Sequence, residues 1–128
     1  MNENELSYKI IGAAIEVHKT LGVGLLENAY ETALAYELKA QGFNVQQQVS
    51  LPMRYKEIAV ENAYKIDLIV ENKVIVEVKS VLELNPIFHS QVLTYLKQAQ
   101  IRLGLLINFN SELIKYGIHR IVNKLIDE

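Results

Sequence analysis

The stretch YKIDLIVENKVIVEVKS, Tyr64 to Ser80, decides the fold of this sequence. It contains two runs of Ile, Leu and Val that are typical of core β-strands, and a short polar segment joins them. We therefore predict a hairpin with strands over 64–70 and 74–80 and a loop over 71–73. Three charged residues interrupt the apolar runs, namely Asp67, Glu77 and Lys79.

Strand geometry predicts how these three charges are arranged. Residues two apart in a strand point the same way, so Glu77 and Lys79 share one face. With an odd-length loop, Asp67 lies opposite Glu77, whereas a two-residue loop without a bulge would put Asp67 on the other face. The hairpin thus predicts two carboxylates and an ammonium group on one surface.

The flanking sequence predicts alternating helices and strands. Helical periodicity and flanking Gly or Pro residues predict helices over 6–22, 25–43 and 86–100. Period-two alternation or continuous apolar runs predict strands over 43–50 and 101–109. We expect Gly42 to cap the second helix, Pro52 to limit the first strand and Asn85 to cap the third helix. The region 51–64 indicates a strand and a turn. The tail indicates a helical turn up to Gly117, followed by a strand or a helix. These elements predict an α/β fold, a mixed central sheet flanked by helices.

Composition limits the function classes. The 128 residues, half of them apolar, fit one domain over 1–128. The absence of cysteine favours a cytoplasmic location, and no apolar run reaches the roughly 20 residues that span a membrane. The 13 Lys and Arg against 15 Asp and Glu give a net charge of −2, which argues against a global basic field for nucleic acid.

Two carboxylates beside a lysine are typical of metal-assisted attack of water on a phosphodiester. Mg²⁺ prefers oxygen ligands and is commonly held by one or two carboxylates plus a substrate phosphate. Asp67 and Glu77 would supply those ligands, and Lys79 would assist the attacking water. The structural alternative is that the charges face solvent or form a Glu–Lys pair, and an isolated D…ExK occurs often by chance.

Four blocks of the chain together resemble a known family. They are GVGLLENAYETALAYEL (22–38), YKIDLIV (64–70), VIVEVKSV (74–81) and HSQVLTYLKQAQIRLGLLINF (89–109). They are similar to the GxxExxY family of the PD-(D/E)XK nuclease superfamily, with Gly24, Glu27 and Tyr30 as the name motif. The resemblance implies a restriction-endonuclease-like core of αβββαβ order with an extra N-terminal helix. Ile66 stands where the superfamily name has proline.

The resemblance also implies residue roles. Asp67, Glu77 and Lys79 match the catalytic triplet, and Glu27 matches an extra acidic residue beside the metal. Gln91 and Tyr95 are similar to the QxxxY pattern that lines the site in RecB-like members. Tyr30 is equally well interpreted as a core aromatic residue, and Gln91 and Tyr95 as partners of backbone groups. Among the histidines, His89 is the only candidate, because we expect it to lie one turn from the candidate site.

The leading hypothesis is a Mg²⁺-dependent nuclease acting on DNA, with Mn²⁺ as an alternative ion. A second hypothesis is a noncatalytic binding or assembly module that keeps the fold and works through a homo-oligomer or a protein partner. A third is an α/β protein whose charges are structural, which predicts that Asp67 and Glu77 lie on opposite faces or well apart.

Overall fold

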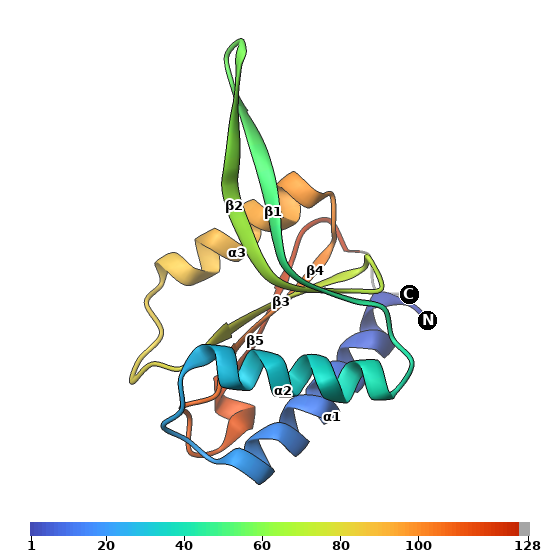
Figure 1. The fold of residues 1–128 in the computed structure, drawn as a ribbon, viewed down its shortest axis with the longest axis vertical. Coiled ribbons are helices and arrows are strands. Elements are labelled where there is room, and N and C mark those ends of the chain that lie inside the picture. Colours follow the sequence, from blue (N-terminus) through green and yellow to red (C-terminus); the bar gives the residue numbers. More distant parts are fainter. Residues whose placement is uncertain (126–128) are drawn as a thin grey trace.

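Residues 1–125, which the computed structural model describes, form a five-stranded mixed sheet with helices on both faces (Figure 1). This arrangement confirms the predicted α/β fold class. In chain order the elements are α1 (Glu3–Leu21), α2 (Glu27–Ala40), β1 (Val45–Tyr55), β2 (Ile58–Val70), β3 (Val74–Lys79), α3 (Ile87–Ala99), β4 (Leu103–Asn108), a 3₁₀ turn (Ile114–Gly117) and β5 (Ile118–Val122).

The sheet has the strand order β1-β2-β3-β4-β5, and only β3 and β4 run parallel. Helix α3 makes the crossover between these two parallel strands, as such connections require. Apolar side chains fill both sides of the sheet: α1 and α2 pack over one face, and α3 packs over the other. Gly104 on β4 permits the close approach of α3, because a Cβ atom there would lie 2.7 Å from Cγ1 of Val92.

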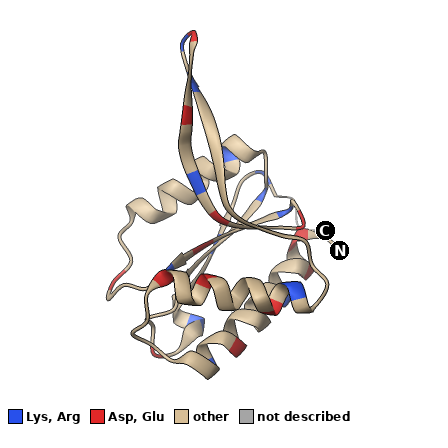
Figure 2. Cartoon of the chain, in the orientation of Figure 1, with Lys and Arg blue, Asp and Glu red and all other residues tan. Residues whose placement is uncertain are grey.

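The first two strands are longer than the sequence pattern indicates. The prediction that Pro52 limits the first strand is wrong, since β1 continues to Tyr55. β1 is an edge strand, where proline is tolerated, and its register with β2 shifts between Leu51 and Met53. The outer part, residues 51–64, projects from the body of the protein (Figure 1). We call this segment the arm, and it carries both signs of charge (Figure 2).

The helix ends differ from prediction by a few residues. Helix α1 begins at Glu3 rather than Leu6, because Asn2 and Glu5 form a reciprocal capping box. Pro86, not Asn85, occupies the N-cap position of α3, but the Asn85 side chain still accepts a hydrogen bond from the Ile87 amide at 3.0 Å. Gly42 follows the end of α2 with a φ of +91°, a conformation suited to glycine.

The C-terminal tail resolves into the strand alternative. The helical turn up to Gly117 is confirmed as a 3₁₀ turn, and β5 follows it and pairs with β4. A Cβ atom at Gly117 would lie only 2.2 Å from the Asn108 carbonyl oxygen, so this return of the chain needs glycine. Within residues 1–125, no helix has the length and apolar character that crossing a membrane demands.

Candidate active site

The hairpin register brings Asp67 and Glu77 together. Leu68 pairs with Val76 and Val70 pairs with Val74, so the loop has three residues. Asp67 and Glu77 are the next residues of the two strands, and the three-residue loop has the odd length that the parity prediction requires. The Asp67 amide donates a hydrogen bond to Oε1 of Glu77 at 3.0 Å, and the Val78 amide donates one to Oδ2 of Asp67 at 2.8 Å.

These carboxylates lie where β2 leaves β3. The paired positions of the two strands end at Leu68 and Val76, whereas β2 stays paired with β1 beyond that point. Separating strands leave amide groups without ladder partners, and an unpaired buried amide is costly. Asp67 and Glu77 accept hydrogen bonds from two of these amides. Asp67 and Glu77 therefore have a structural role where the two strands separate.

Glu77 is held in an unfavourable setting for a charge. Its side chain is only 6% exposed. Burial, and secondly the negative charge of Asp67, raise the pKa of Glu77 to about 9, and Lys79 opposes this shift. A carboxyl group with these neighbours binds a cation or a proton in preference to remaining as a bare anion. Such perturbed acids are characteristic of functional sites.

Lys79 ends β3 on the same face of the sheet as Glu77. Its Nζ atom lies 4.2 Å from the centroid of the Phe88 ring, in the first turn of α3. A cation over an aromatic face is held by the electrostatics of the ring. The Phe88 ring thus holds the ammonium group, whose positive charge opposes the rise in the pKa of Glu77.

A third carboxylate, which the sequence analysis missed, reaches this pair through a glutamine. Gln48 Nε2 donates to Oε1 of Glu31 at 2.5 Å and to Oδ1 of Asp67 at 3.2 Å. Gln47 donates to the other Glu31 oxygen at 3.2 Å. Burial, opposed by the Gln47 hydrogen bond and supported by the charge of Asp67, raises the pKa of Glu31.

Gln48 adopts a φ of 51° within β1, in the left-handed region that non-glycine residues rarely visit. Strained residues persist where their surroundings hold them, and they cluster at functional sites.

The sequence contained a signal for Glu31, because this residue shares a helical face with the buried Leu34 and Leu38. A carboxylate on an apolar helix face needs a partner or an ion.

Glu27 lies apart from this cluster. It is the exposed first residue of α2. Its end of the helix is nevertheless tied to β3, because the Ser80 hydroxyl donates to the Leu25 carbonyl at 2.6 Å. In residues 1–125 no three His, Cys, Asp or Glu side chains form a group that could hold a metal ion. The structure therefore gathers Asp67 and Glu77 without Glu27.

Tyr30 is placed as a core aromatic residue. It is fully buried and stacks on Phe109 with ring centroids 4.7 Å apart. Its hydroxyl donates to the Gly22 carbonyl at 2.6 Å and accepts from the Leu25 amide at 3.2 Å. Tyr30 thus fixes the loop between α1 and α2 rather than facing the carboxylates.

The α3 candidates divide into two groups. Burial, followed by the charges of Glu77 and then Asp67, raises the pKa of Tyr95, so its hydroxyl lies within the field of the carboxylate pair. Gln91 is exposed and lines the same surface hollow as Tyr95. The ring of His89 instead contacts that of His119 on β5, 5.3 Å between centroids, and burial and then His89 lower the pKa of His119.

Comparison with protein-family models shows which family this chain matches. Residues 4–121 match the model of the PD-(D/E)XK nuclease superfamily. The chain belongs to the PD-(D/E)XK nuclease superfamily. No curated protein and no solved structure gives a significant match. The superfamily match does not extend to the GxxExxY family, which stays a prediction.

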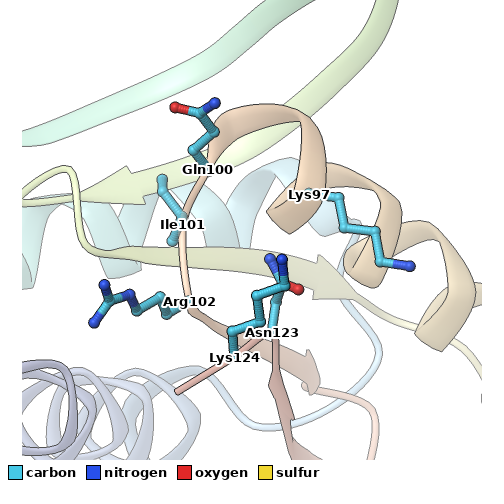
Figure 3. Close-up of a pocket in the computed structure, with 6 residues that line it drawn as sticks. All are labelled: Lys97, Gln100, Ile101, Arg102, Asn123 and Lys124. Carbon is cyan, nitrogen blue, oxygen red and sulfur yellow. The ribbon is translucent and has the colours of Figure 1, made fainter. Parts of the chain in front are cut away.

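This PD-(D/E)XK protein has a second hollow far from the carboxylates. It measures about 470 Å³ and lies beside the N-terminal end of β4, where its lining includes Lys97, Arg102 and Lys124. The Asn123 amide donates to the Arg102 carbonyl at 2.8 Å and closes this end of the sheet. In Figure 3 the side chains of Lys97 and Arg102 extend away from each other. They do not converge on one point, as they would around a single bound anion.

Proposed function

We propose that this protein is a Mg²⁺-dependent nuclease that hydrolyses phosphodiester bonds in DNA. The observation that carries the proposal is the Asp67–Glu77 pair, held by main-chain hydrogen bonds where β2 and β3 separate, with Lys79 on the same face. Superfamily membership supports a metal-dependent nuclease in general terms. The ion, the substrate and the residue roles are our inferences.

The residues present fit a divalent metal ion. Asp67 and Glu77 offer oxygen atoms, the donors that Mg²⁺ and Mn²⁺ prefer. Burial, and secondly the negative charge of Asp67, raise the pKa of Glu77, and a cation held by the two carboxylates would favour their charged forms. A bound metal ion supplies an activated water and neutralises charge on the phosphate. Asp67 and Glu77 would hold it, and the Gln48-linked Glu31 would orient Asp67.

The remaining groups have roles of their own. The Lys79 ammonium would orient the attacking water and offset charge that grows on the phosphate in the transition state. Its contact with Phe88 limits the conformations of a long, flexible side chain. The Tyr95 hydroxyl would donate a hydrogen bond toward the substrate, because a phenol is already protonated at neutral pH and burial, followed by the charges of Glu77 and Asp67, raises its pKa further.

The direct test combines isothermal titration of Mg²⁺ and Mn²⁺ with cleavage of single- and double-stranded DNA. Asp67→Asn is the informative variant, because its carboxamide oxygen can still accept from the Val78 amide while the charge is lost. We expect wild type to bind metal and cleave, and Asp67→Asn to do neither. Glu16→Gln on α1 is the matched control and should behave as wild type.

A noncatalytic binding or assembly module is the second candidate function. The net charge of −2 favours it, because the chain has no global basic field that would capture DNA without help. It would act through a second copy of the chain or a protein partner. A melting temperature unchanged by Mg²⁺ or Mn²⁺, together with full cleavage activity in both Asp67→Asn and Lys79→Ala, would contradict the nuclease proposal. An unchanged melting temperature with no cleavage by wild type would favour the module.

A further inference from the structure

A hollow of about 300 Å³ lies between the arm and α3. Its lining includes Tyr64 at the base of the arm and, on α3, Ser90, Gln91, Thr94 and Tyr95. The two tyrosine rings meet edge to face, with centroids 5.9 Å apart and planes at 74°. This volume is at the lower end of the range for small-molecule sites.

The aromatic wall is held in place from both sides. The Tyr64 hydroxyl donates to Sδ of Met53 at 3.5 Å, across the two strands of the arm. Tyr95 lies on α3 and contacts the apolar cluster beneath that helix. Edge-to-face packing then fixes each ring against the other. A ring that is held in this way needs little reorganisation to accept another ring against its face.

The hollow adjoins the carboxylate pair. Tyr64 lies three residues before Asp67 on β2, and its ring meets that of Tyr95, which also lines the hollow. Burial and then the charges of Glu77 and Asp67 raise the pKa of Tyr95. Gln91 lies four residues before Tyr95 and therefore on the same face of α3. A group seated in the hollow would be a near neighbour of whatever the carboxylates hold.

The chemistry of the lining selects the class of ligand. No Lys, Arg, Asp or Glu is among the described residues that line the hollow. Phosphate recognition would call for cations or converging amides, which favours an uncharged ligand. Aromatic rings with an amide and hydroxyls at the rim match a nucleobase, which has a π-face for stacking and edges for hydrogen bonds.

We propose that this hollow receives an unpaired nucleobase next to the phosphate at the carboxylate pair, so that the substrate is single-stranded. The inference rests on the proposed nuclease function and names its substrate class. The base stacks on Tyr64, and the Gln91 side chain hydrogen-bonds its edge. Because Glu77 is only 6% exposed, the phosphate has to approach the sheet closely, and an unpaired strand can turn its base aside to do so.

The test is binding without divalent metal, so that no cleavage occurs. A fluorescein-labelled 12-residue oligodeoxythymidine is titrated with protein and followed by anisotropy, with a single abasic nucleotide moved through every position. We expect one or two adjacent abasic positions to weaken binding to wild type about tenfold. Tyr64→Ala should bind weakly at every position and lose this dependence on position, whereas Tyr64→Phe should keep it.

Two further variants distinguish a specific loss of the base pocket from misfolding of the protein. Thr94→Trp fills the hollow from the exposed side of α3 and should also abolish the position effect. Tyr8→Ala removes an exposed tyrosine on α1, 77% accessible, and should leave binding unchanged. Equal affinity for all abasic oligonucleotides, or equal affinity for a duplex of the same length, would overturn the base pocket.

Cleavage assays separate this inference from the proposed function. Metal-dependent cleavage of duplex DNA but not of single-stranded DNA would support the proposed nuclease function and contradict the base pocket. Position-dependent binding of the single strand, without metal binding or cleavage, would support the base pocket and contradict the proposed nuclease function.

Discussion

The two ends of β3 and β4 differ in the charge of their side chains and in how firmly those side chains are held. At the C-terminal end of β3, Glu77 is buried, Asp67 accepts two hydrogen bonds and Lys79 rests on an aromatic ring. At the other end, Lys97 and Arg102 are exposed around a larger hollow and point apart (Figure 3). The difference favours the end with the held groups, rather than the end with the larger hollow, as the reactive site that we propose.

The largest expected effect is a loss of activity at one end only. Lys79→Met keeps an apolar stem near Phe88 but removes the ammonium group, and we expect cleavage to fall at least about 100-fold. Lys97→Met is the matched control at the other end and should stay within about twofold of wild type. Single-turnover cleavage of a labelled oligonucleotide measures both, and equal losses would break the comparison.

A smaller effect should separate the two candidate carboxylates of α2. Glu31→Gln removes the charge that is linked to Asp67 through Gln48, and we expect metal affinity to fall about tenfold. Glu27→Gln changes an exposed residue at the helix start and should alter affinity less than about twofold. Titration calorimetry with Mn²⁺ compares them, and the reverse order would return Glu27 to the site.

The raised pKa of Glu77 predicts an effect on stability. Between the unfolded value of about 4.5 and the folded value of about 9, the folded protein keeps a proton that the unfolded chain releases. Stability therefore falls as the pH rises through this window. Without metal, Glu77→Gln should flatten this fall and raise the melting temperature at pH 8 by at least about 3 °C.

Thermal unfolding at several pH values measures this effect, and Glu16→Gln serves as the control. A Glu77→Gln protein that melts below wild type at pH 8 would argue that the carboxylate contributes more by its hydrogen bond to the Asp67 amide than burial costs.

The smallest effect is expected at the basic end. Since Lys97 and Arg102 diverge, each can contact at most its own phosphate. Arg102→Ala should weaken oligonucleotide binding by less than about threefold, equally for all sequences, and lower the salt dependence by one contact or less. Anisotropy titrations at several salt concentrations test this. A loss of tenfold or more would make the basic end a true binding surface.

Local rules in the sequence determined the hairpin and its register. Side chains alternate with a period of two, and the length of the loop fixes parity, so the opposition of Asp67 and Glu77 follows from residues 64–80 alone. The helices follow from periodicity in the same way, apart from a few residues at their ends. The prediction from Pro52 was wrong because whether a strand lies at the edge of a sheet, where proline is tolerated, is a property of the whole sheet.

Only the tertiary structure decided which further residues are linked to the Asp67–Glu77 pair. Glu27 and Glu31 lie one helical turn apart, and the choice between them depends on how α2 packs against β1, through Gln48. The sequence alone does not decide whether Tyr30 is a core or a site residue, whereas its stacking on Phe109, far along the chain, places it in the core. These contacts join segments 17 to 79 residues apart in sequence, and no periodicity within one segment contains the packing that selects them.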